Sequence, residues 1–88
     1  MDSKKNHIVK CKPEADYHVW IQFEDGLDGI VDLRDLLGKK VFKESWRSIE
    51  NFNAVRIDPV THTLTWGKEG DEVDVDPASL RKEILDKL

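Results

Sequence analysis

The sequence is poor in cysteine and has no long apolar run. Its 88 residues include one cysteine, Cys11, so no disulfide can form within the chain, which suits a reducing compartment. No stretch approaches the ~20 consecutive apolar residues of a membrane span. The first residues, Met1–His7, lack the apolar segment of a signal peptide. We therefore expect a cytoplasmic protein that has no membrane partner.

Glycine and proline are also scarce, with five and three residues, and no linker, repeat or low-complexity tract interrupts the chain. A chain of this length has no room for a second hydrophobic core. We expect one domain over residues 1–88, with residues 1–5 disordered. The net charge is −4 and the pI about 5.3, an acidic balance that argues against nucleic acid as a partner for this domain on its own.

Alternation and turn residues predict an α+β fold, mainly an antiparallel sheet with short helices and a C-terminal helix. Asp25-Gly26 and Asp28-Gly29 supply positive-φ positions for a hairpin. Asp76 and Pro77 form the start of the last helix, whose apolar stripe is Leu80, Ile84, Leu85 and Leu88. The expected elements are strands at 7–12, 17–24 and 29–33, a helical turn at 33–38, a helix at 44–50, strands at 52–58, 63–66 and 72–75, and a helix from 77.

A series of short motifs, in a fixed order, carries a family resemblance. They are Phe23-x-Asp25-Gly26-x-x-Gly29-x-Val31-Asp32-Leu33, then Phe42 and Trp46, then Phe52-x-x-Val55, then Trp66, and finally Asp74-x-Asp76-Pro77-x-x-Leu80. In this order the chain resembles a small bacterial family of unknown function, domain of unknown function 2442, over residues 8–80. The loop at Trp66–Gly70 departs slightly from that family's pattern.

The resemblance implies a compact α+β fold and brings no activity or catalytic residue with it. Members of the family are often encoded beside another small protein in a toxin–antitoxin-like arrangement, and some are joined to a helix-turn-helix domain. Both contexts imply a module that binds a partner or regulates it. No helix-turn-helix is visible in this sequence.

The candidate chemistry is weak. The acidic run Asp71, Glu72, Asp74 and Asp76 could hold Ca²⁺ or Mg²⁺, but a solvated strand that leads into a helix cap explains it better. His7, His18 and Cys11 could meet on adjacent strands as a soft-metal site, although such a coincidence is common. We expect no catalytic residue, no metal and no cofactor, and hence no enzyme.

Two surfaces are candidates for binding. The basic residues Lys39, Lys40, Lys43 and Arg47 surround Phe42 and Trp46, and such interleaving can bind nucleic acid. The competing interpretation places both aromatic residues in the buried stripe of a short helix. A nucleic-acid-associated regulator is therefore the alternative function, and a small metal-dependent enzyme is a third.

The second surface follows from strand parity. If Val19 and Ile21 face the core, then Trp20 and Ile30 face the other side of the sheet, and we place Ile8 with them. Either a short helix covers these side chains or they mediate association with a second copy or a protein encoded nearby. We therefore expect a protein-interaction or regulatory module, and Ile8, Trp20 and Ile30 are its predicted interface.

Overall fold

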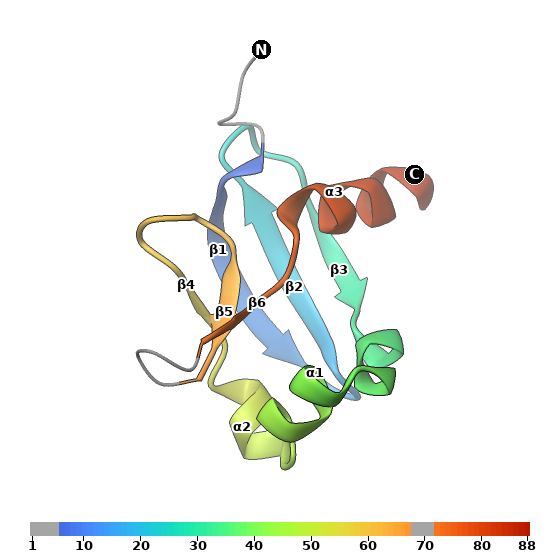
Figure 1. Ribbon diagram of the computed structural model, residues 1–88. Coiled ribbons are helices and arrows are strands. Elements are labelled where there is room, and N and C mark those ends of the chain that lie inside the picture. The colour runs from blue at the N-terminus through green and yellow to red at the C-terminus, as the bar shows by residue number, and fades with distance from the viewer. Residues whose placement is uncertain (1–5, 68–71) are drawn as a thin grey trace.

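The computed structural model describes residues 6–67 and 72–88, which form two small antiparallel sheets and several short helices. The segment 1–5, for which we predicted disorder, lies outside the described residues. Sheet A has the order β1-β2-β3 and sheet B the order β4-β5-β6, and the predicted α+β class is confirmed. Figure 1 shows sheet B and α3 in front of one face of sheet A, with α1 and α2 at its lower end. The strands are β1 (Ile8–Glu14), β2 (His18–Phe23), β3 (Asp28–Asp32), β4 (Arg56–Ile57), β5 (Leu64–Trp66) and β6 (Val73–Asp74).

The helices are the 3₁₀ helix η2 (Arg34–Gly38), α1 (Lys40–Ser45), α2 (Ile49–Asn53) and α3 (Pro77–Asp86). The Asp76 carboxylate accepts a hydrogen bond from the Ala78 amide at 3.1 Å, so the predicted cap of α3 is confirmed. Leu80 and Ile84 are buried, but Leu88 is 87% exposed, so the apolar stripe ends at Ile84. Among the described residues, no helix has the length and apolarity needed to cross a bilayer.

Strand β1 continues through Pro13, where the sequence predicted its end. The carbonyl of Tyr17, the residue before β2, accepts a hydrogen bond from the Leu33 amide after β3. Hydrogen-bonded pairs alternate along an antiparallel ladder, so the odd-numbered residues of β2 direct their backbone N–H and C=O groups toward β3. Pro13 lies opposite the odd-numbered Val19. Its ring nitrogen therefore points away from β2, to the free side of an edge strand, where the missing N–H removes no hydrogen bond.

An irregularity in β1 corrects the prediction for Ile8. Ile8 lies opposite Phe23, and Lys10 lies opposite Gln22, so Val9 is an extra residue in the ladder. This bulge reverses the facing of the residues before it. Ile8 is consequently a core residue, 1% exposed, and the prediction that it joins Trp20 and Ile30 on the other face is wrong.

The two glycines of the β2–β3 hairpin have different roles. Gly26 has a φ of +96°, as the turn requires. Gly29 lies inside β3 without a positive φ, so that part of the prediction is wrong. A Cβ at Gly29 would lie 3.1 Å from both Cγ atoms of Ile84. Gly29 is therefore needed for the close approach of α3 to β3.

The core between the sheets is rich in aromatic side chains. Trp46 and Trp66 are each 1% exposed and lie edge to face, 4.8 Å between ring centroids, with Phe52 beside both. The strand predicted at 52–58 is confirmed only at Arg56–Ile57, which form β4, because Phe52 belongs to α2. Ser48 caps that helix by accepting from the Asn51 amide at 3.2 Å. The predicted helix at 44–50 is in fact two helices, α1 and α2.

Side chains of α3 cover the free edge of β3. Glu83 accepts a hydrogen bond from the Asp32 amide at 2.7 Å, and Lys87 Nζ donates to the Ile30 carbonyl at 3.1 Å. Glu83 and Lys87 also pair with each other at 3.2 Å. These side chains occupy backbone groups to which another strand would otherwise pair.

Candidate functional site

The face of sheet A that points away from the core is the most distinctive surface of the molecule. We call it the outer face and define it by three side chains from each strand. None of the nine is buried, and among the described elements no helix lies over it, since sheet B and the helices are associated with the opposite face (Figure 1). In rows across the strands β1, β2 and β3, the outer face consists of Lys10, Gln22 and Asp28, then Lys12, Trp20 and Ile30, then Glu14, His18 and Asp32.

The centre of the outer face is apolar. Trp20 on β2 lies directly opposite Ile30 on β3, so the structure brings these two predicted interface residues together. Ile30 is 46% exposed, and Trp20 is partly exposed. The indole Nε1 of Trp20 donates to the Asp28 carboxylate at 3.0 Å. This hydrogen bond fixes the ring against β3 and leaves a large apolar side chain on an open sheet.

Opposite charges flank that apolar centre. Lys10 and Lys12, both exposed, lie on the β1 side, and the exposed Asp28 lies on the β3 side. Lys10 and Lys12 are two residues apart in β1, so the alternation of side chains along the strand places both on the same face. Lys10 and Lys12 lie within the strand predicted at 7–12, but local alternation does not give the register with β2 that places them beside Gln22 and Trp20.

The third row of the outer face is largely paired within the chain. Arg34 contacts the Asp32 carboxylate, with its closest nitrogen at 2.7 Å, and also reaches Asp16 at 3.3 Å. Hydrogen bonds from Arg34 hold the pKa of Asp32 well below its usual range. His18 Nε2 lies 3.7 Å from the same carboxylate. Asp32 is thus ion-paired within the chain, whereas the Asp28 carboxylate accepts the hydrogen bond from Trp20.

The predicted basic segment is exposed, but its aromatic residues are not. Phe42 and Trp46 are 7% and 1% exposed, which confirms the interpretation as a buried helical stripe. They cannot stack on bases. The four cationic residues, all exposed, are Lys39, Lys40, Lys43 and Arg47.

The residues considered for metal binding are dispersed. His18 lies at one end of the β1–β2 ladder, whereas His7 precedes the other end and stacks on His62 with ring centroids 4.2 Å apart. Burial raises the pKa of the Cys11 thiol. Asp76 serves as the cap of α3, and Asp71 lies outside the described residues. Within residues 6–67 and 72–88, no three His, Cys, Asp or Glu side chains are grouped closely enough to hold a metal ion.

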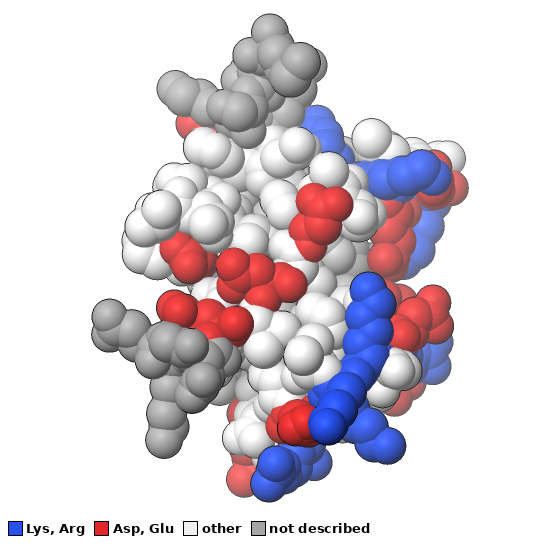
Figure 2. Space-filling model, viewed as in Figure 1, with Lys and Arg blue, Asp and Glu red and all other residues white. Residues whose placement is uncertain are grey.

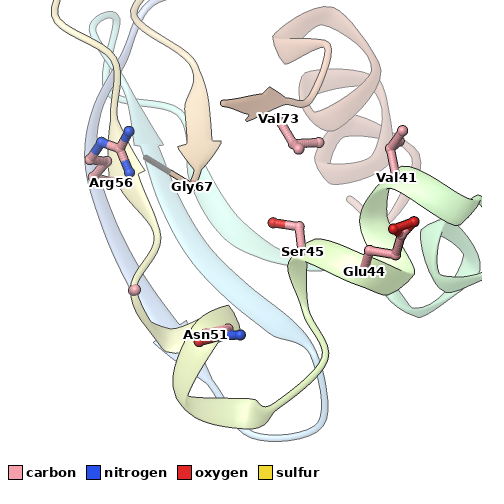
Figure 3. Close-up of a pocket in the computed structure, with 8 residues that line it drawn as sticks. Val41, Glu44, Ser45, Asn51, Arg56, Gly67 and Val73 are labelled. Atoms are coloured by element: carbon pink, nitrogen blue, oxygen red, sulfur yellow. The ribbon is translucent and has the colours of Figure 1, made fainter. Parts of the chain in front are cut away.

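One cavity, with a volume of about 700 Å³, lies between α1, α2 and sheet B. In Figure 3, Ser45 and Glu44 project from α1, while Arg56 lies across the hollow on β4. A nucleophile needs an adjacent base to become reactive. Among the described residues that line this cavity there is no His or Cys, and the one carboxylate is that of Glu44, the residue before Ser45.

A smaller groove of about 440 Å³ lies between η2, β6 and α3. Figure 2 shows carboxylates across the middle of the face that sheet B and α3 form. Of the apolar residues of this groove, Leu33, Phe42, Val75 and Leu80 are buried, whereas Leu36 is partly exposed. Its acidic side chains include the α3 cap Asp76 and the edge-covering Glu83, which already have partners.

The fold and the outer face thus define a small α+β domain that presents one uncovered, partly apolar sheet surface. The sequence matches the model of a family described as a protein of unknown function, DUF2442, over residues 8–86. The chain belongs to this family, as the resemblance implied. A comparison with curated proteins and a comparison with solved structures each found no match.

Proposed function

We propose that this domain acts by binding another protein chain through its outer face, with Trp20 and Ile30 as the anchors. The observation that carries the proposal is the pair itself, a tryptophan and an isoleucine side by side on an uncovered sheet face. Such a face commonly carries polar side chains when it meets only water. Buried tryptophan anchors contribute about 2 kcal/mol or more to binding.

The edges of sheet A support a face-on mode of binding. Glu83 and Lys87 occupy the free edge of β3, and Pro13 removes a donor from the free edge of β1. Strand addition at these edges is therefore disfavoured. The face between the edges remains the accessible surface of the sheet.

Binding, and not catalysis, is the activity that we propose. The partner is either a second copy of the chain or a protein encoded beside it, and the second case would make the domain a regulatory member of a toxin–antitoxin-like pair. Trp20 and Asp28 would then position the partner through one preformed hydrogen-bonded pair.

The test is to measure association of the purified chain, alone and with each protein encoded beside it, for wild type, Trp20→Ala and Ile30→Ser. We expect the variants to remain folded, because neither residue is buried, and to lose at least tenfold in affinity. Val41→Ser is the matched control, since Val41 is 59% exposed on α1, away from sheet A. Unfolding of Trp20→Ala, or equal losses in the control, would contradict the proposal.

A further inference from the structure

The charges in the first row of the outer face are self-complementary. This row runs from Lys10 on β1 through Gln22 to Asp28 on β3. A cation thus lies on one side of the central strand and an anion lies on the other. A surface that is self-complementary in this sense can pair with its own copy about a two-fold axis.

We infer that the partner of the outer face is a second copy of this chain, packed face to face about a two-fold axis that runs parallel to β2. The inference rests on the proposed function and specifies the partner. Such an axis exchanges the β1 and β3 sides and keeps each row in place. Lys10 of each copy then lies over Asp28 of the other, and Trp20 lies over Trp20 at the centre.

The second row fits the same arrangement. The aliphatic stem of Lys12 lies over Ile30 of the other copy, while the ammonium group can extend into water. In the third row Glu14 lies over Asp32. Arg34 already contacts Asp32 within the chain, so Glu14 of the second copy meets an ion pair and not a lone carboxylate. Two sheets packed in this way keep their strands within about 30° of each other, so neighbouring rows stay in register.

The other face-to-face symmetry is electrostatically worse. An axis perpendicular to the strands keeps β1 over β1 and reverses the rows. Lys12 would then lie over Lys12, an opposition of like charges that the parallel axis avoids. Lys10 would meet Glu14, and Asp28 would meet Asp32, which Arg34 already pairs within its own chain. Like charges in direct opposition are destabilising, so charge favours the axis parallel to β2.

The size of the outer face indicates a weak dimer. Three strands at the usual spacing, each contributing three side chains, cover a patch roughly 15 Å on a side. The area of such a patch is well below the ~800 Å² per partner of a standard interface. We expect a dissociation constant on the order of micromolar or weaker, with association that strengthens as salt is lowered.

Charge exchange between two variants tests the arrangement by sedimentation at low salt up to about 1 mM chain. Lys10→Glu brings two carboxylates together at both symmetry-related contacts with Asp28, and Asp28→Lys brings two ammonium groups together at both contacts with Lys10. Each variant alone should therefore associate about tenfold more weakly than wild type. When the two variants are mixed and their chains exchange, heterodimers form. The heterodimer is the informative species, because one of its two contacts has the charges reversed and the other keeps the native charges.

In that heterodimer, the first contact joins the substituted carboxylate of Lys10→Glu to the substituted ammonium of Asp28→Lys, and the second joins the native Asp28 of one chain to the native Lys10 of the other. Both contacts are attractive, so the mixture should dimerise like wild type. Lys40→Glu and Glu50→Lys, exposed charges on α1 and α2, are matched controls that should change nothing.

A wild-type chain that stays monomeric at about 1 mM would overturn the inference. So would a mixture that associates no better than the stronger of its two components. The perpendicular axis leaves the substituted carboxylate of Lys10→Glu over Glu14 in the heterodimer, so the mixture would then fall between the two components. Asp28→Asn, which keeps an acceptor for Trp20, checks that loss of association in Asp28→Lys arises from charge. If the chain is monomeric and Trp20→Ala still abolishes binding to a protein encoded nearby, the second-copy inference fails and the proposed function stands.

Discussion

Gly29 is the point where the structure makes its sharpest prediction about stability. A Cβ at this position would come within 3.1 Å of Cγ1 and Cγ2 of Ile84 on α3. Overpacking of this kind costs about 1–3 kcal/mol. Because the backbone of Gly29 does not have a positive φ, an alanine also gains about 0.4–1 kcal/mol from reduced freedom of the unfolded chain. Gly29→Ala should therefore reduce the free energy of unfolding by about 1 kcal/mol.

A double-mutant cycle separates these two effects. Ile84→Ala should cost about 2–5 kcal/mol, because Ile84 is 3% exposed and its removal leaves a cavity. In that background the new methyl group at position 29 meets no Cγ atoms, so Gly29→Ala should become neutral or stabilising. The sign of its effect is thus expected to reverse between the two backgrounds.

Urea titration of the four proteins, followed by circular dichroism, measures the cycle. For a domain of this size, 1 kcal/mol corresponds to about 4–8 °C in melting temperature, which provides a second readout. Gly38→Ala is the control, since a Cβ at Gly38 meets nothing within 4 Å and should behave identically in both backgrounds. An equal loss from Gly29→Ala in both backgrounds would refute the proposed contact with Ile84.

Two further predictions concern the charged ends of elements. Asp76→Ala should lower the free energy of unfolding by about 1 kcal/mol through loss of the α3 cap, and a melting temperature equal to wild type would show that the cap contributes nothing. Arg81 holds the pKa of Asp25 below its usual value, as Arg34 does for Asp32. As the pH falls below about 4, the unfolded chain binds these protons first. The melting temperature should therefore decline between about pH 5 and pH 2, and less steeply in Asp32→Asn.

Local signals in the sequence were sufficient for parts of the fold. Asp76-Pro77 identified the start of α3, and alternation identified β2, because a cap and an amphipathic strand depend on neighbouring residues. The strand predicted at 52–58 is shorter in the structure, where only Arg56–Ile57 form β4 and Phe52 belongs to α2. Ser48 is a good cap residue upstream, but the apolar residues that follow fit either periodicity, and packing of Phe52 against Trp46 and Trp66 decides for a helix.

Features that depend on distant residues were beyond local reasoning. The bulge that turns Ile8 into the core is set by the pairing of β1 with β2 and by the hydrogen bond from the Ile8 amide to the His62 carbonyl. For the outer face, parity correctly grouped Trp20 with Ile30. The charges beside them required the full register of β1, since Lys10 and Asp28 are not adjacent in any local pattern.

The cover that α3 places over the edge of β3 has a consequence for the order in which the chain is synthesised. The hydrogen bonds from Asp32 to Glu83 and from Lys87 to Ile30 join residues 51 and 57 positions apart. A ribosome therefore releases β3 well before the segment that shields it, at about 5–20 residues per second. Throughout that interval the strand can pair with a neighbouring nascent chain, so crowded polysomes are the setting in which aggregation of this protein should begin.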